Sequence, residues 1–552
     1  MSLDASSLSA DAFPVEPQAF LDADARAGVL ADNGKSSYSI DQAATQLLRD
    51  DDTWSSMGQP FTVTYAFRAS APATMPSDTG GFTQFNAAQI KEAELALKAW
   101  SDVANIRFVR IGVGTSGPAA YSDNATILFG DYTTGEAGSA AFTFFPGSTA
   151  YSSSAGDVWV NGTLSYNLAP TIGNYGGMTL VHEIGHAIGL EHPSDYNASA
   201  NTSLSYGTDA SYYEDDRQYT IMSYFGETST GANFGGVYAA SPMLDDIAAV
   251  QRAYGANMAT RAGDTVYGFN SNADEPWFVA SSSSSKLVFA VWDAGGTDTF
   301  DFSGYSSNQL IDLRPGNFSN VGGLAGNVAI AQNVTIEDAV GGPGADIIYG
   351  NAAGNTINGG AGADTIVGGS GARNQLLGGD GSDAITGGAG FDIVNGNKGD
   401  DTIDGGPGGN DWLLGGQGND LITAHAGVNI MNGNLGADIE TGGAGDDTVR
   451  GGQGDDSLNG GAGNDHLLGD LGNDTLSGGS GADTFHFQAG GGQDLVTDFN
   501  AAEGDRIELD GGATYTLGQN AAGAVIALAS GDTITLAGVD AASLPAGSIV
   551  LA

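Results

Sequence analysis

Residues 182–192 read His182-Glu183-Ile184-Gly185-His186-Ala187-Ile188-Gly189-Leu190-Glu191-His192. On a helix of about 3.6 residues per turn, His182 and His186 lie one turn apart on the same face, so both imidazoles can reach one ion. Gly189 can adopt a backbone conformation that other residues resist, which lets the chain end its helix and bring His192 to that ion from another direction. Three protein ligands leave one position open for water, and this openness distinguishes a catalytic zinc site from a structural one.

Glu183 is the candidate general base of such a site. Water bound to zinc has its pKa lowered from ~15.7 to about 7, and a neighbouring carboxylate can then take its proton. The short pattern HExxH also occurs by chance on amphipathic helices, where its histidines are ordinary surface or core side chains. The glycine and the third histidine argue against that reading, since three of the chain's six histidines fall in this run.

A second segment, Tyr219-Thr220-Ile221-Met222-Ser223-Tyr224-Phe225, has the form of a Met-turn, the methionine-bearing floor beneath the zinc of metzincins. Met222 is expected to pack rather than to bind metal, because a flexible thioether fills irregular space well. The residues alone leave two interpretations of Tyr224. It is either a buried tyrosine that is hydrogen-bonded to a carbonyl or a phenol close enough to bind the metal.

Together these motifs resemble those of serralysin-type metzincins, secreted bacterial zinc proteases joined to calcium-binding glycine-rich repeats. Pro193 directly follows the third histidine, as in that family, and residues 41–44, 99–105 and 244–249 are also similar. The resemblance implies that His182, His186 and His192 hold one Zn²⁺ and that Glu183 is the base. It also implies that Tyr224 is a labile fifth ligand that helps to stabilise the tetrahedral intermediate. The implied activity is that of a zinc metalloendopeptidase acting on extracellular proteins.

Composition limits the other possibilities. A chain of 552 residues is too long for one ordinary core, so at least two domains are expected. It has no apolar run of about 20 residues, and its first thirty residues do not have the form of a general secretory signal. The absence of cysteine excludes disulfides and a thiolate that would block the zinc. A net charge of −48 argues against nucleic acid and anionic lipid as partners.

From Gly341 to about Phe487 the chain repeats every nine residues with the pattern GGxGxDxUx, where U is a large apolar residue. The glycines allow tight turns whose carbonyls face a cation, the aspartate adds an oxygen ligand, and the apolar residue points inward on a short strand. Such composition is also typical of disordered linkers, but the strict period argues against disorder. The sequence predicts a parallel β-roll with Ca²⁺ ligands at Gly342, Gly344, Asp346, Asp364, Asp383, Asp392, Asp401, Asp447, Asp456, Asp465, Asp474 and Asp483.

The repeat array has defects. Asn355 and Asn429 replace the aspartate, Arg373 lies near the ligand position of one copy, and the copies from Gly368 and Gly405 each carry one extra residue. We expect weakened or missing calcium sites at these copies. Without calcium the acidic side chains of the roll would repel one another, so its folding should depend on calcium. Because calcium is scarce inside cells and abundant outside, we expect the chain to leave the cytoplasm loosely folded and to become ordered outside the cell.

Two acidic segments lie between the protease and the repeats. Either one, at 261–265 or 292–298, is by itself compatible with an ordinary turn. The resemblance implies calcium ligands at Arg261, Gly263, Thr265, Asp293, Gly295, Gly296 and Asp298, with Thr335 and Glu337 at the start of the first repeat site.

The predicted fold class is an α+β metzincin-type zinc protease domain followed by an all-β parallel β-roll. Predicted protease elements are strands at 61–68, 106–111 and 125–129 and helices at 86–103 and 177–190. In relatives, the region of the 125–129 strand forms the edge along which substrate lies extended. The expected division is 1–32, a propeptide or disordered N-terminus; 33–255, the protease; 256–340, a β-rich connection; 341–487, the roll; and 488–552, a β-rich cap.

The cap resembles the uncleaved signal read by a type I ABC secretion apparatus, although Gly547 to Ala552 lacks the acidic residue common in relatives. The favoured function is therefore a secreted, calcium-stabilised zinc endopeptidase made as a zymogen. One alternative is a calcium-dependent cell-surface or adhesion protein whose protease serves only self-processing. Another is a scaffold that keeps a zinc site without useful activity. A protein inhibitor as partner and retention at the cell surface stay open.

Overall fold

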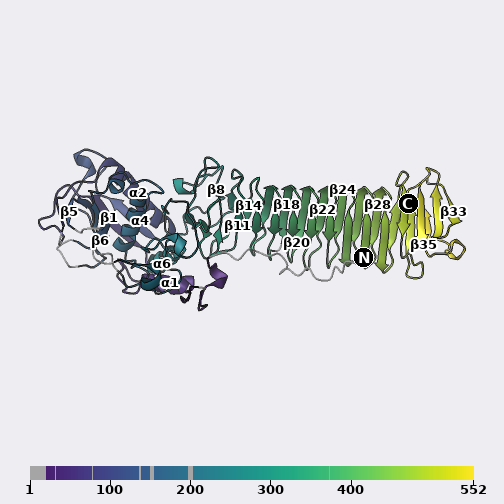
Figure 1. The fold of residues 1–552 in the computed structure, drawn as a ribbon, viewed down its shortest axis with the longest axis horizontal. Coiled ribbons are helices and arrows are strands. Elements are labelled where there is room, and N and C mark those ends of the chain that lie inside the picture. Colours follow the sequence, from purple (N-terminus) through teal and green to yellow (C-terminus); the bar gives the residue numbers. More distant parts are fainter. Residues whose placement is uncertain are drawn as a thin grey trace.

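The computed structural model describes residues 20–31, 33–76, 79–135, 139–148, 154–196, 203–371 and 373–551. The molecule is elongated, with a mixed α/β domain at one end, a long stack of strands in the middle and a β-rich cap at the other end (Figure 1). The predicted fold class is confirmed, since helices α1 to α6 all precede the strand stack. Within the described ranges, no helix is long and apolar enough to cross a membrane.

The α/β domain is built on a sheet with the strand order β3-β1-β4-β7-β6. Helix α2 begins where Asn86 accepts hydrogen bonds from two backbone amides and Gln89 returns one, which is a capping box. Its buried face packs on α4, the helix that carries the paired histidines. The elements of the domain are α1 (Ile40–Leu47), α2 (Ala87–Val103), α3 (Ser165–Leu168), α4 (Tyr175–Ala187), α5 (Tyr206–Asp209), α6 (Leu244–Tyr254), β1 (Phe61–Phe67), β2 (Thr79–Gly80), β3 (Ile106–Arg110), β4 (Ile127–Tyr132), β5 (Thr134–Gly135), β6 (Ala141–Thr143) and β7 (Val158–Asn161).

The expectation that the 125–129 strand lies at the sheet edge is wrong. That strand is β4, and it pairs in parallel with β1 on one side and β7 on the other. All six of its residues are buried, which suits an interior strand. Among the described residues, the edge strand next to the histidine helix is β6, which pairs antiparallel with β7 and with no other strand.

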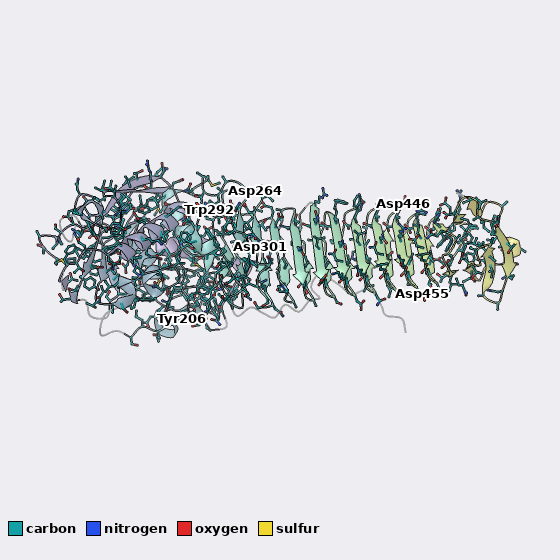
Figure 2. All side chains as sticks on the ribbon, turned by 90° about the horizontal axis from the view of Figure 1, so that it is seen from above. Tyr206, Asp264, Trp292, Asp301, Asp446 and Asp455 are labelled. Atoms are coloured by element: carbon teal, nitrogen blue, oxygen red, sulfur yellow. The ribbon has the colours of Figure 1, made fainter. Side chains whose placement is uncertain are left out.

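The strand stack is a parallel β-roll made of two facing sheets. From β14 to β32 successive strands alternate between the sheets, so each of these strands pairs with the one two places along the chain. In the described residues each sheet has 13 strands, and only the β33–β34 and β34–β35 pairs within them are antiparallel. The turns form two long edges, and Asp446 and Asp455, one repeat apart, lie on opposite edges (Figure 2).

One sheet contains β8 (Val266–Gly268), β10 (Thr299–Asp301), β14 (Asp338–Val340), β16 (Thr356–Ala361), β18 (Arg373–Asp380), β20 (Phe391–Lys398), β22 (Trp412–Gln417), β24 (Ile430–Leu435), β26 (Thr448–Gln453), β28 (His466–Leu471), β30 (Thr484–Phe487), β32 (Arg506–Leu509) and β36 (Ile549–Leu551). The other contains β11 (Leu310–Asp312), β15 (Ile347–Tyr349), β17 (Thr365–Val367), β19 (Ala384–Thr386), β21 (Thr402–Asp404), β23 (Leu421–Thr423), β25 (Ile439–Ala444), β27 (Ser457–Ala462), β29 (Thr475–Ser480), β31 (Gln493–Val496), β33 (Tyr515–Gln519), β34 (Gly523–Leu528) and β35 (Thr533–Ala537). A small third sheet joins β9 (Phe289–Val291), β12 (Phe318–Ser319) and β13 (Val328–Ile330).

The apolar repeat position fills the space between the two sheets, as predicted. The predicted inward residues are buried, namely Ile366, Ile385, Val394, Ile403, Val449, Leu458, Leu467 and Leu476. The extra residues of two copies are absorbed in the turns. The ladder steps by 18 residues in most turns and by 19 where a step spans an extra residue, namely at Asn355–Asn374, Asp364–Asp383, Asp392–Asp411 and Asp401–Asp420.

Residues 1–19 of the expected N-terminal segment lie outside the described residues. From Phe20 onward the chain packs on the protease and on the third sheet. Phe20 meets Phe318 edge to face, with ring centroids 5.6 Å apart, and the buried Arg26 donates to both carboxylate oxygens of Asp245 on α6. The cut that would release a propeptide stays a prediction, as do the other domain boundaries.

Candidate metal centre

Helix α4 and the turn after it bring the three predicted histidines together. His182 and His186 lie one turn apart on α4, and His192 follows the helix. Gly189 has a φ of +102°, and a Cβ there would lie 2.2 Å from the carbonyl oxygen of Asp52. Only glycine can therefore make this turn, which folds His192 back to the helix.

The geometry of the three imidazoles fits one tetrahedral metal ion. Each Nδ1 lies within hydrogen-bond distance of a backbone carbonyl: Ile221 O at 2.9 Å, Leu190 O at 2.6 Å and Tyr196 O at 3.0 Å. With Nδ1 as the donor, each Nε2 presents a lone pair, and the Nε2 atoms lie 3.1 Å (His186–His192) and 3.4 Å (His182–His192) apart. Zn–N distances of ~2.0–2.1 Å place tetrahedral ligand atoms about 3.3 Å apart. Facing lone pairs at such distances favour a cation between them.

Burial keeps His182 and His186 neutral, as metal binding requires. It lowers the pKa of His182 to about 4. Burial and the two neighbouring imidazoles lower the pKa of His186 well below its usual value. Neutral imidazole is the form that binds a metal ion, so the site is prepared to hold one at neutral pH.

Glu183 lies beside the histidines and is also buried. Its Oε2 accepts a hydrogen bond of 2.7 Å from the hydroxyl of Thr143 on the edge strand β6. Burial raises the pKa of Glu183 to about 7. A carboxyl group with this pKa can both accept and return a proton near neutral pH.

Met222 forms a tight floor beneath the histidine helix. A Cβ on Gly185 would lie 2.5 Å from its Sδ and 3.1 Å from a ring carbon of Trp100, so the glycine of the helix is needed for this contact. Asp246 of α6 holds the Met-turn through Thr220 Oγ1 (2.6 Å) and Ile221 N (2.7 Å). The Met-turn in turn places the Ile221 carbonyl that orients His182.

Tyr224 packs against the cluster, with its ring centroid 4.4 Å from that of His192 and 5.7 Å from that of His182. Two open cavities of about 300 Å³ each meet at Glu183 and Tyr224. Residues of β6 line both cavities. A chain laid along β6 would therefore pass the three histidines.

Comparisons with known proteins agree with this geometry. The family described as "Matrixin" matches residues 53–225, and "Peptidase M10 serralysin C terminal" matches residues 256–519. "Serralysin C" of Dickeya chrysanthemi is 50% identical over 58% of this chain and 66% of its own length. "Metallopeptidase AprA" of Pseudomonas marginalis is 48% identical over 60% and 69%, and "Serralysin" of Proteus mirabilis is 48% identical over 58% and 66%. The matches thus span about two thirds of the length of these relatives.

The chain belongs to the serralysin-type metzincins. This family of metallopeptidases is zinc-dependent, and the buried histidine triad of this chain is a cluster suited to the metal. The carboxylates of a second cluster, Asp102, Asp274 and Glu275, are paired with Lys98 and Arg261 instead.

The predicted calcium residues of the connection lie together. Thr265 N donates to Asp298 Oδ1 at 2.8 Å, and Asp298 N donates to Glu337 Oε2 at 2.8 Å. In the described residues Asp298 Oδ2 is buried without a hydrogen-bond partner, and burial raises the pKa of Asp298 to about 7. The other predicted residues lie in the same segments. Gly263 O accepts from Thr265 Oγ1, Gly295 N donates to Asp293, and the side chain of Arg261 donates to Trp292 O. A Cβ on Gly296 would lie 2.6 Å from the carbonyl carbon of Gly263, and Thr335 is two residues before Glu337.

The roll aspartates share one pattern. Oδ1 accepts from a backbone amide of the preceding turn, as Asp456 Oδ1 does from Asp438 N at 2.8 Å. Across the described residues, Oδ2 is buried and unpartnered at the predicted Asp364, Asp383, Asp392, Asp401, Asp447, Asp456, Asp465, Asp474 and Asp483. Asp346 differs, since Gln309 N and Gly342 N each donate to one of its oxygens. A row of unpaired hard oxygen atoms suits Ca²⁺.

Sequence reasoning missed several residues of these sites. Asp411, Asp420 and Asp438 have the same unpartnered Oδ2. Each follows the ligand position of the preceding copy by nine or ten residues, and this spacing is the signal that would have found them. In the copy with Arg373, the ligand position is filled by the buried Asn374, because the extra residue shifts the register by one. Thr143 carries no motif, so only the fold reveals its contact with Glu183.

Proposed function

We propose that this chain is a secreted, calcium-stabilised zinc endopeptidase that cleaves peptide bonds in extracellular proteins. The observation that carries the proposal is the convergence of three buried Nε2 atoms beside Glu183, in a chain that belongs to a family of zinc proteases. His182, His186 and His192 would hold the metal. Bound zinc supplies a Lewis acid that polarises the scissile carbonyl and lowers the pKa of a bound water to about 7.

Glu183 then accepts the proton of the attacking water and returns it to the leaving nitrogen. Its raised pKa supports both steps near neutral pH. The hydroxyl of Thr143 fixes the Oε2 atom, which leaves Oε1 for the water. Tyr224 is proposed to donate toward the developing oxyanion, and the packing of its ring on His192 supports this role.

Substrate binding is proposed to occur along β6. In the part of the chain that the structure describes, this strand is paired on one side, so its other side can pair with an extended peptide. The cavities on either side of Glu183 would accept side chains of that peptide. Backbone hydrogen bonds to β6 would align the peptide with the metal whatever its side chains are. Such binding suits a protease that accepts many substrate sequences.

Calcium is proposed to hold the connection and the roll together. The support is the set of unpartnered buried carboxylate oxygens, whose ionised form is costly to bury unless a cation pairs with it. We propose export through a type I ABC apparatus that reads the cap, with a cleavable N-terminal propeptide and a protein inhibitor as further partners. The comparisons do not favour the adhesion alternative, since the relatives are named as serralysins and metallopeptidases.

The test is casein hydrolysis by the calcium-loaded chain and by its Glu183→Ala variant, with zinc content measured in both. Glu94→Gln, on the surface and paired with Arg110, is the matched control and should keep full activity. We expect zinc in all three proteins and a loss of turnover in Glu183→Ala alone. Equal cleavage by Glu183→Ala and the parent would exclude Glu183 as the base.

A further inference from the structure

Glu440 breaks the apolar pattern inside the roll. It lies on β25 at the inward repeat position, in register with Ile422 on β23 and Leu458 on β27. Its side chain is 0% exposed, and within the described residues neither Oε1 nor Oε2 makes a hydrogen bond of normal geometry, although the backbone amide of Gly433 on β24 lies near the carboxylate. A carboxylate therefore stands where the neighbouring turns carry an isoleucine and a leucine.

The nearest acidic groups form a ladder beside it. Asp438 Oδ1 accepts from Asp420 N, and Asp456 Oδ1 accepts from Asp438 N, each at 2.8 Å. The Oδ2 atoms of all three aspartates are buried without a partner among the described residues. Residues 438 and 440 are two apart on extended backbone, so both side chains point to the interior of the roll. The longer glutamate side chain can bend toward the ladder.

An ionised carboxylate enclosed among apolar side chains costs several kcal/mol unless something pairs with it. A leucine, as at position 458, would carry no such cost. Adjacent turns of the roll lie about 4.8 Å apart, so one ion with Ca–O distances of about 2.4 Å can reach the Oδ2 atoms of two neighbouring aspartates, here Asp438 and Asp456. Together with the two Oε atoms these make four buried oxygens that share the same need. Calcium takes 6–8 oxygen ligands, so added turn carbonyls would complete the ligand shell of the ion.

The opposite edge of the same turn shows the reverse change. Asn429 replaces an aspartate there, and its Nδ2 donates to Asp447 Oδ1 at 3.0 Å. That edge therefore has one carboxylate fewer, and one oxygen of its next carboxylate, that of Asp447, is already hydrogen-bonded to the Asn429 amide. Glu440 supplies a carboxylate to the other edge within the same turn. The negative charge of the turn is kept, but it moves to the Asp438 edge.

We propose that Glu440 is an additional Ca²⁺ ligand, supplied from the inside of the roll to the ion held between the turns of Asp438 and Asp456. The inference rests on the proposed binding of calcium by the roll. It assigns a binding role to a residue outside the nonapeptide ligand set. The middle of the array thereby gains a cation site of a different composition from its neighbours.

The test uses the full chain and the variant Glu440→Leu, which restores the apolar residue of the adjoining turns and should not harm folding. Glu440→Gln keeps the size and removes the charge, and Ile422→Leu is the control in the same row. Bound Ca²⁺ is counted by equilibrium dialysis with atomic emission over a range of free Ca²⁺, and melting temperatures are measured in calcium and in chelator.

Glu440→Leu and Glu440→Gln should each lose one bound ion or weaken one site by about tenfold or more, while Ile422→Leu keeps the parent values. Glu440→Leu should also melt at a higher temperature than the parent in chelator and gain less from calcium. Unchanged ion count and affinity in Glu440→Leu, with higher stability in both conditions, would overturn the role of Glu440. A parent chain that binds no Ca²⁺ would instead overturn the calcium-binding roll itself.

Discussion

Replacing Gly185 by alanine tests whether the floor beneath the zinc site is as tight as the structure shows. The new Cβ would lie 2.5 Å from Met222 Sδ and 3.1 Å from Met222 Cε, well inside ordinary contact distances of ~3.5–4.0 Å. Relief of this overlap costs about 1–3 kcal/mol, as in other overpacked cores. Alanine gains about 1 kcal/mol over glycine in a helix interior. The expected net effect is a loss of up to about 2 kcal/mol.

The displaced Met222 would also disturb metal binding. It follows Ile221, whose carbonyl lies 2.9 Å from His182 Nδ1 and orients that ring. Losing such an outer contact typically weakens metal binding by about 10–100-fold. Zinc affinity is measured by competition with a chromophoric chelator, and stability by scanning calorimetry at a fixed scan rate.

Gly207→Ala provides the matched control. Gly207 lies in helix α5, and an added Cβ there meets no atom within 4 Å, so this variant should be neutral or slightly stabilised. A partial rescue is expected when Gly185→Ala is combined with Met222→Ala, which removes the clashing thioether. The reasoning fails if Gly185→Ala holds zinc as tightly as the parent and, like Gly207→Ala, melts no earlier.

Three other perturbations test the electrostatics. Arg26→Ala leaves Asp245 buried and unpaired, which should cost about 3–5 kcal/mol in calorimetry, and a change below about 1 kcal/mol would contradict the buried pair. Burial raises the pKa of Asp131 to about 7, above its unfolded value, so stability is present at low pH and is lost as pH rises through 7. Part of this stability is already lost at pH 5, because the unfolded carboxyl ionises at about pH 4, so Asp131→Asn should melt later than the parent at pH 8 and by a smaller margin at pH 5. Burial likewise raises the pKa of roll aspartates such as Asp401 to about 7. In chelator the roll should therefore keep its circular dichroism at pH 5 and lose it at pH 8, and added Ca²⁺ should restore it. Equal spectra at both pH values in chelator would refute this.

The parts of the molecule that local spacing determines were predictable. A helix brings residues four apart onto one face, so His182 and His186 had to lie together, and a strict nine-residue period has few structural solutions other than a roll. The burial of residues such as Ile366 and Leu467 follows from that period alone. Predicted and observed strands also agree closely for β1 and β3.

What the sequence could not provide depends on contacts between distant segments. The order of strands in the protease sheet is set by packing, so the sequence of β4 does not reveal that β6 takes the edge. The inserted residue beside Arg373 leaves two alignments of that copy, and only the ladder shows that Asn374 fills the ligand position. Glu440 follows the same logic, because its significance lies in the apolar residues of the neighbouring turns.

The contacts of Tyr219 link the metal centre to the small sheet that lies between the protease and the roll. Tyr219 opens the Met-turn, its hydroxyl donates to Leu21 O at 2.9 Å, and its ring meets Phe318 of β12 with centroids 5.3 Å apart. Strand β12 belongs to the small sheet with β9 and β13, which adjoins the candidate calcium residues Asp293 and Asp298. Because Tyr219 lies on the same turn as Ile221 and Met222, order in the connection reaches the carbonyl that orients His182. Calcium would therefore stabilise the zinc site by holding its floor, with no need for an ion near the histidines.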